Sequence, residues 1–242
     1  PVVEAGVGPR GRCRDMNDDL MLLSAVVGAV CALAGWLFGP LRHAVTAVHE
    51  AGHTLVALLA GRSVRSVRLN RDSSGEAVSV GRQGGLGVVL TLLAGYPAPG
   101  IVGLGGLVAL RADQARIWLV AGAVVVALMA LLLRNAFGVV VIACVGALLV
   151  ATLRWASDPV TNVVVASASW FLLVGGLRSA LELFRPHVGR DDAMELARVG
   201  HVPAFVWRFV FLLAAIACLT AAAAVVGVLE PVRSSLARLG GA

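Results

Sequence analysis

Long apolar blocks separated by short polar segments make up most of this chain. The first block, Leu20 to Phe38, is uncharged and stops at Gly39-Pro40, a pair that favours the end of a helix. The second, Leu41 to Ala60, carries ionisable side chains near its middle. Blocks of about 20 apolar residues can cross the roughly 30 Å hydrocarbon core of a bilayer. The pattern predicts two membrane helices, and we expect the first to be retained because no small-residue cleavage site follows it.

The segment from Arg62 to Gln83 has a different pattern. Apolar residues alternate with five arginines, and Asp72-Ser73-Ser74-Gly75 supplies turn chemistry. Alternation with a period of two, interrupted by turn residues, is typical of a β-hairpin. The sequence predicts a short hairpin between membrane helices.

The next block, Gly84 to Leu110, is interrupted by Gly95-Tyr96-Pro97-Ala98-Pro99-Gly100 and predicts a broken helix or two half-helices. A polar loop, Arg185 to Val202, separates the last two blocks. The remaining blocks predict four further helices: Ile117 to Leu133, Phe137 to Leu153, Thr161 to Phe184 and Ala204 to Leu229. We therefore expect an all-α polytopic membrane protein with about six to seven transmembrane helices and a short cytoplasmic hairpin.

Composition supports the membrane interpretation. Apolar residues make up 59% of the chain and charged residues 14%, and the mean hydropathy is +0.89, which lies outside the usual range of a soluble domain. We expect a polar N-terminal segment at 1–19, one membrane domain at 20–230 and a C-terminal tail at 231–242. The four cysteines show no ligand-like spacing, so neither a disulfide nor a cysteine-bound metal is predicted.

The charge distribution predicts topology. All 20 basic residues are arginines, the net charge is +6, and the arginines stand singly between apolar blocks. This pattern argues against nucleic-acid binding and resembles the arginine bias of cytoplasmic loops. We expect the N-terminus, the hairpin and the polar loop to be cytoplasmic. Arginine without lysine, with abundant alanine, valine and glycine, suggests a GC-rich bacterial genome and hence a bacterial plasma membrane.

The motif His49-Glu50-Ala51-Gly52-His53 lies within the second apolar block. Two histidines four residues apart are separated by about 400° of helical rotation, so both side chains leave one face and can share a metal ion. Imidazole is a good zinc ligand, and catalytic zinc takes three protein ligands and a water. Glu50, about 100° from His49, is placed to accept a proton from that water.

Because the motif lies in a predicted membrane helix, its occurrence by chance would be energetically unfavourable. Each ionisable side chain at a helix centre costs about 3 kcal/mol on insertion scales, and this motif places three within five residues. The small Ala51 and Gly52 allow another segment to approach the metal. Alternatives are a buried hydrogen-bonded cluster or an ion path through a transporter. His43 is expected to be an interfacial histidine.

A third ligand must come from another segment. The stretch Asp191-Asp192-Ala193 precedes an amphipathic segment, and we select Asp192 as the ligand and Asp191 as a candidate helix N-cap. The alternatives for Asp192 are capping and solvated charge. His187, His201 and Asp158 are expected to be surface groups.

Several segments together resemble the site-2 protease class of membrane zinc metalloproteases, and within it a compact bacterial branch. The matching segments, which span roughly residues 20 to 210, are His49 to His53, Ala60-Gly61-Arg62, Asp72 to Gly75, Ala94 to Pro99, Arg134 to Gly138, and Asp192-Ala193 with Pro203 and Trp207. The Leu-Asp-Gly sequence that better-known members carry on a later helix is missing here, and the hairpin is too short to hold an inserted PDZ-like domain.

The resemblance implies one zinc ion on His49, His53 and Asp192, with Glu50 activating water. Candidates for substrate contact are Tyr96, Pro97, Pro99 and Asn135. The implied activity is hydrolysis of peptide bonds in membrane-anchored proteins by a zinc-dependent intramembrane endopeptidase, with a membrane protein substrate and the lipid bilayer as partners.

Two other functions stay open, a membrane transporter and an inactive scaffold that retains the fold. No internal repeat of the kind expected in many carriers is evident. The hairpin edge and the backbone of Tyr96 to Gly100 could hold an extended substrate, or they could be a simple connector and a packing kink.

Overall fold

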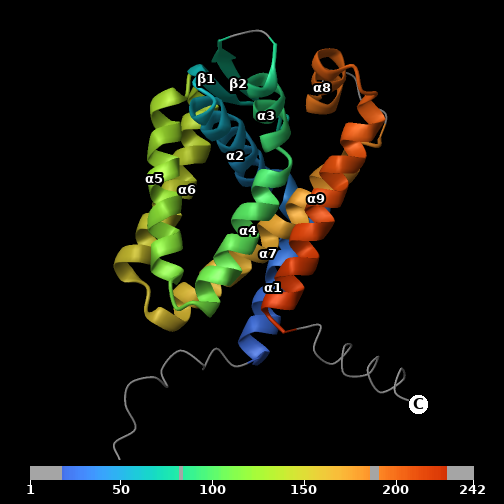
Figure 1. The fold of residues 1–242 in the computed structure, drawn as a ribbon. Coiled ribbons are helices and arrows are strands. Elements are labelled where there is room, and N and C mark those ends of the chain that lie inside the picture. The colour runs from blue at the N-terminus through green and yellow to red at the C-terminus, as the bar shows by residue number, and fades with distance from the viewer. Residues whose placement is uncertain (1–17, 82–83, 186–190, 228–242) are drawn as a thin grey trace, which may run out of the picture.

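The computed structural model describes residues 18–81, 84–185 and 191–227 (Figure 1). Most of the expected N-terminal segment and the expected C-terminal tail therefore lie outside the described residues. The elements, in chain order, are α1 (Asp18–Leu33), α2 (Gly35–Leu59), β1 (Ser63–Leu69), β2 (Gly75–Val80), α3 (Leu86–Ala94), α4 (Pro97–Arg111), α5 (Ala115–Leu132), α6 (Ala136–Trp155), α7 (Asp158–Glu182), α8 (Asp192–Gly200) and α9 (Ala204–Val225).

Four of these helices, α5, α6, α7 and α9, are long and apolar enough to cross a membrane. Two bent pairs, α1 with α2 and α3 with α4, raise the number of candidate spans in the described chain to six. Large apolar side chains face outward on the long helices, such as Leu131 at 71% and Leu213 at 62% exposure. Such surfaces are stable against lipid but not against water. The expected all-α polytopic membrane fold with a small hairpin is confirmed.

The first helix break differs from the expectation. It falls at Ala34, whose backbone is extended, and Pro40 lies inside α2. A proline removes one hydrogen bond from a helix, but Phe38 is buried in a cluster of α1, α2 and α7 residues that holds the first turns of α2 in place. The end of α1 is capped from a distance, because the Arg178 guanidinium donates to the carbonyl of Ala32 at 2.7 Å. The prediction of a break at Gly39-Pro40 was therefore wrong.

The second break lies where it was predicted. Helices α3 and α4 meet at Gly95-Tyr96 with a bend of 61°. The break is shorter than expected, since Pro97 is the first residue of α4. Proline is well tolerated at that position because the first amides of a helix have no intrahelical partner. Pro99 also lies in this first turn and is fully buried.

The predicted hairpin is confirmed, and one of its two edges is covered. Strands β1 and β2 pair antiparallel through a five-residue turn at 70–74. On the other side of β1, Val67 bridges Leu133 in the α5–α6 connection, and the amide of Arg134 donates to the carbonyl of Val67 at 3.0 Å. The Asn135 side chain continues this pairing at Leu69, donating to its carbonyl at 2.6 Å. The edge of β2 is therefore the one left for another strand.

The two ends of the helical bundle carry different parts of the chain. Figure 1 shows the start of α1 and the end of α9 at one end, with the hairpin and α8 at the other. The sequence-based expectation placed the N-terminus and the hairpin on the same side of the membrane. In the described chain, α1 and α2 form a pair bent by 95°, which is either a broken span or a re-entrant loop, so the side of the membrane on which each end lies stays a prediction.

Candidate metal centre

The two histidines of the motif converge on one point. His49 and His53 lie on α2, a 25-residue helix, and their Nε2 atoms are 3.0 Å apart. The rings are nearly perpendicular, at 86°. Helical spacing alone produces this pairing, because residues four apart are stacked on one face.

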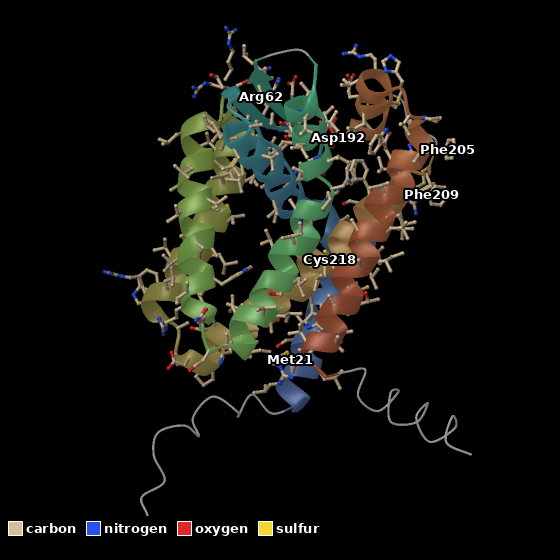
Figure 2. All side chains as sticks on the ribbon, viewed as in Figure 1. Met21, Arg62, Asp192, Phe205, Phe209 and Cys218 are labelled. Carbon is tan, nitrogen blue, oxygen red and sulfur yellow. The ribbon has the colours of Figure 1, made fainter. Side chains whose placement is uncertain are left out.

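Asp192 completes the group from a separate helix. Its Oδ2 atom is 3.1 Å from Nε2 of His53 and 3.2 Å from Nε2 of His49. It is the first residue of α8, 139 positions after His53. Figure 2 shows Asp192 at the same end of the molecule as Arg62, far from Met21. The predicted third ligand thus lies beside the predicted pair.

The three ligand atoms fit a zinc ion. The centre of the triangle they form lies about 1.8 Å from each atom, close to the zinc–ligand distances of about 2.0–2.1 Å, so these three residues would be able to hold a zinc ion together. The donor set of two imidazoles and one carboxylate also suits zinc. Among the described residues, His49, His53 and Asp192 are a group able to hold a metal ion.

The tautomer of His53 strengthens this fit. Its Nδ1 lies 2.7 Å from the carbonyl oxygen of Thr91 on α3. A carbonyl oxygen only accepts hydrogen bonds, so Nδ1 carries the proton, and Nε2 of the neutral ring keeps its lone pair. In the neutral ring that lone pair faces the Asp192 carboxylate, so the contact between the two acceptors needs either a proton on Nε2 or a metal ion. Thr91 therefore orients His53 for metal binding.

The histidines of the group lower the pKa of Asp192. Burial alone would raise the pKa of Asp192, but the charge of His53 and hydrogen bonds from both imidazoles outweigh burial and hold that pKa far below its usual range. Asp192 is consequently ionised at neutral pH, as a metal-binding carboxylate must be.

Glu50 lies beside the three ligands with a free oxygen. Its residue is 3% exposed, and its Oε2 atom has no hydrogen-bond partner among the described residues. The backbone of Gly75, at the start of β2, lies directly over the carboxylate, and a Cβ at that position would collide with Oε1. Buried carboxylates normally have partners, so the free oxygen marks a group that awaits a water or a substrate.

Glycines also create the space around the imidazoles. A Cβ on Gly95 would come within 2.5 Å of Nε2 of His53 and 2.6 Å of Nε2 of His49. A Cβ on Gly52 would come within 2.8 Å of the Ala94 carbonyl. The predicted close approach of another segment at Gly52 is therefore present, and that segment is the α3–α4 break.

A cavity of about 560 Å³ opens onto this group. The edge of β2 forms one wall, and α3 and α8 form the facing side. Its lining residues are His49, Glu50, His53, Arg62, Gly75, Glu76, Ala77, Val78, Ser79, Val88, Thr91, Leu92, Asp192, Glu195, Arg198 and Val199. An extended peptide placed along β2 would therefore pass the metal group.

The four predicted substrate contacts lie in different settings. Tyr96 is beside the metal group, with its ring edge-on to His49 at 4.7 Å between centroids. Pro97 begins α4, whereas Pro99 is buried against Gly176 of α7. Asn135 holds the main chain of Leu69. None of the four lines the described cavity, so their contact with substrate stays a prediction.

The other candidates have separate roles or lie elsewhere. Asp191 is the N-cap of α8, as predicted, accepting from the Met194 amide at 2.7 Å. His43 packs edge-on against Phe137, and Asp158 pairs with Arg116. The remaining two are His201, which is exposed at the end of α8, and His187, which lies outside the described residues.

Three residues that contribute to the metal site were not identified from the sequence. Thr91 acts through its main-chain carbonyl, which any residue possesses, so no sequence signal could identify it. Gly75 and Gly95 were interpreted as a turn residue and a helix breaker. Their additional role is the absence of a side chain next to Glu50 and the imidazoles.

The comparison with known families agrees with this geometry. A family model described as Peptidase M50B-like matches residues 22–222, which include all three ligands and Glu50. No curated protein and no solved structure matches the chain. The matched region covers most of the 242 residues, and the chain belongs to the Peptidase M50B-like family of membrane metallopeptidases.

Proposed function

We propose that the protein is a zinc-dependent endopeptidase that hydrolyses peptide bonds of membrane-anchored proteins. One observation carries the proposal: three ligand atoms converge within 3.2 Å of one another beside a buried glutamate whose free oxygen lacks a partner in the described chain. A scaffold or a transporter needs no unpaired carboxylate beside a metal group, whereas hydrolysis needs a base at that place.

Each residue has a defined role in this mechanism. His49, His53 and Asp192 would hold the ion, and Thr91 fixes the ring of His53. When bound, zinc would supply a Lewis acid that polarises the scissile carbonyl and makes water acidic. Glu50 accepts the proton of the attacking water and returns it to the departing amine. The missing side chain of Gly75 lets the β2 backbone lie close to the Glu50 carboxylate.

The substrate would bind as an added strand. The edge of β1 is occupied by the α5–α6 connection, while five consecutive residues of β2 line the cavity. Main-chain hydrogen bonds to a sheet edge recognise an extended peptide irrespective of its sequence. A helical membrane segment would first have to unwind, since a peptide bond inside a helix is not accessible to a base and a metal.

Mutation of Glu50 tests the activity. The protein is purified in detergent, its zinc content is measured, and cleavage of a membrane-anchored reporter is followed. Glu50→Gln is expected to retain zinc and lose cleavage by at least about a hundredfold, the usual scale for a lost general base. Asp158→Asn is the matched control, because it removes a carboxylate outside the cavity that pairs with Arg116 at 3.1 Å and should leave cleavage intact.

Two results would contradict the proposal. Equal cleavage by the native protein and Glu50→Gln would exclude Glu50 as the base. Retained zinc without hydrolysis of any membrane-anchored substrate would favour the inactive scaffold.

We further propose that the hairpin end faces the cytoplasm of a bacterial plasma membrane. Because the N-terminal start of α1 lies at the opposite end (Figure 1), only one of the two can be cytoplasmic. In the described chain, the connections at the hairpin end carry Arg62, Arg65, Arg68, Arg71, Arg134, Arg185 and Arg198, and those at the other end carry Arg111, Arg116 and Arg154. An excess of arginine marks the cytoplasmic side.

A further inference from the structure

The third ligand is held less directly than the other two. His49 and His53 share the 25-residue α2, whereas Asp192 begins α8, a helix of nine residues. Helix α8 packs against α3 and α9 through a cluster that contains Ala193, Leu196 and Phe211. Apolar packing is not directional, so it does not by itself fix which way Asp192 points.

Asp191, the residue before Asp192, makes the directional contacts that can fix the position of Asp192. Asp191 uses its two carboxylate oxygens separately: Oδ1 accepts from the Met194 amide at 2.7 Å, and Oδ2 accepts from the Arg208 guanidinium at 3.0 Å. The first bond starts α8 at Asp192. The second ties that start to the second turn of α9, one of the four long spans.

The ion pair is well shielded from water. The Asp191 side chain is 7% exposed and that of Arg208 is 24% exposed. An exposed ion pair contributes little to structure, but loss of one partner of a shielded pair leaves an uncompensated charge that must move towards water. If Asp191 moves, the backbone of Asp192 moves with it.

We propose that Asp191 and Arg208 are positioning residues for the metal centre, and that their ion pair sets Asp192 against His49 and His53. The proposal rests on the metal site of the proposed function, and it assigns Arg208 a task that no metal ligand performs. Through this pair, the affinity for zinc depends on the docking of α8 onto α9.

The test measures zinc binding alone, without any substrate. The full-length protein is purified in detergent and stripped of metal, and zinc is titrated against a competing chelator. Arg208→Gln and Asp191→Asn are each expected to weaken zinc binding by about 10–100-fold, the range seen when residues that support a ligand are removed. Asp191→Asn retains an oxygen for the helix cap, so its effect reports the ion pair.

Three further variants separate positioning from general stability. The double variant should bind zinc no more weakly than either single variant, because both remove one interaction. Arg208→Lys keeps the charge and should recover part of the affinity. Arg116→Gln breaks the Arg116–Asp158 pair at the opposite end of the molecule and should bind zinc like the native protein.

Cobalt provides a second readout. The visible absorption of bound Co²⁺ depends on ligand number and geometry, so Arg208→Gln should shift the spectrum towards that of Asp192→Ala. Native zinc affinity in Arg208→Gln, or strictly multiplicative losses in the double variant, would overturn the positioning role while leaving the metal site intact. Failure of the native protein itself to bind zinc would overturn the proposed function and this inference together.

Discussion

At the residue scale, the absence of a side chain at a glycine beside the metal group is as important as the side chains that neighbouring residues contribute. Gly95 adopts an ordinary helical backbone, with φ of −61°, so its conformation does not require glycine. Its importance comes from the imidazoles, which occupy the space where a Cβ would be. Sequence reasoning identified Gly95 through its effect on the helix and could not see the neighbours that make it necessary.

Gly95→Ala is therefore expected to weaken zinc binding with little effect on the fold. The added methyl group would push Nε2 of His53 or of His49 away from its present position, and we expect a loss of affinity of at least about tenfold, comparable with disturbed support of a ligand. Zinc titration with a competing chelator measures it. The control is Gly39→Ala in α2, where no atom lies within 4 Å of the new methyl group; an equal loss there would contradict the steric explanation.

At the scale of elements, the hairpin is held by contacts that its own sequence does not contain. Asn135 accepts from the Leu69 amide at 3.3 Å and donates to the Leu69 carbonyl at 2.6 Å. The turn at 70–74 is fixed separately, since the Thr46 hydroxyl donates to the Ser73 carbonyl at 3.0 Å. The middle of α2 and the α5–α6 connection are thus both joined to the hairpin that covers Glu50.

Asn135→Ala should loosen the hairpin. Two main-chain groups of Leu69 lose their partners, which we expect to cost about 1–3 kcal/mol, and hydrogen exchange at the Leu69 amide should accelerate. Asn70→Ala is the matched control, because the Asn70 amide only donates to the exposed Ser74 hydroxyl at 2.9 Å. If exchange at Leu69 accelerates equally in both variants, Asn135 does not anchor the strand.

These elements show which features can be predicted from sequence. The zinc pair, the Asp191 cap and the hairpin follow from spacing and turn chemistry within a few residues. The break at Ala34 does not, because its stabilising cation, Arg178, lies 146 positions from Ala32. Asp192 was found through resemblance and residue type, while its contact with His53 depends on the packing of α8.

At the scale of the whole molecule, both described ends of the chain lie at one end of the bundle (Figure 1), and Asp192 of the metal group lies towards the other (Figure 2). Such an arrangement follows from an even number of crossings, six when each bent pair is one span. The proposed orientation therefore rests on the arginine bias and not on the N-terminus.

Labelling from one side of the membrane checks this orientation. In a background without native cysteines, Arg65→Cys on the hairpin and Gln114→Cys on the α4–α5 connection both place a thiol at an exposed position. A reagent that cannot cross the membrane, applied to intact cells, should modify the cysteine at 114 and spare the one at 65. The reverse pattern would place the metal centre on the outer side.

The separation of the metal ligands along the chain also affects how the protein can be made. A metal ion held by this group would join His53 to a residue 139 positions later and so would close a very long loop. Only earlier folding of the intervening helices can reduce the entropy cost of that closure. During synthesis the first two ligands enter the membrane long before the third exists. The nascent chain therefore lacks a complete metal site until α8 has left the ribosome, and the proposed proteolytic activity cannot begin before then.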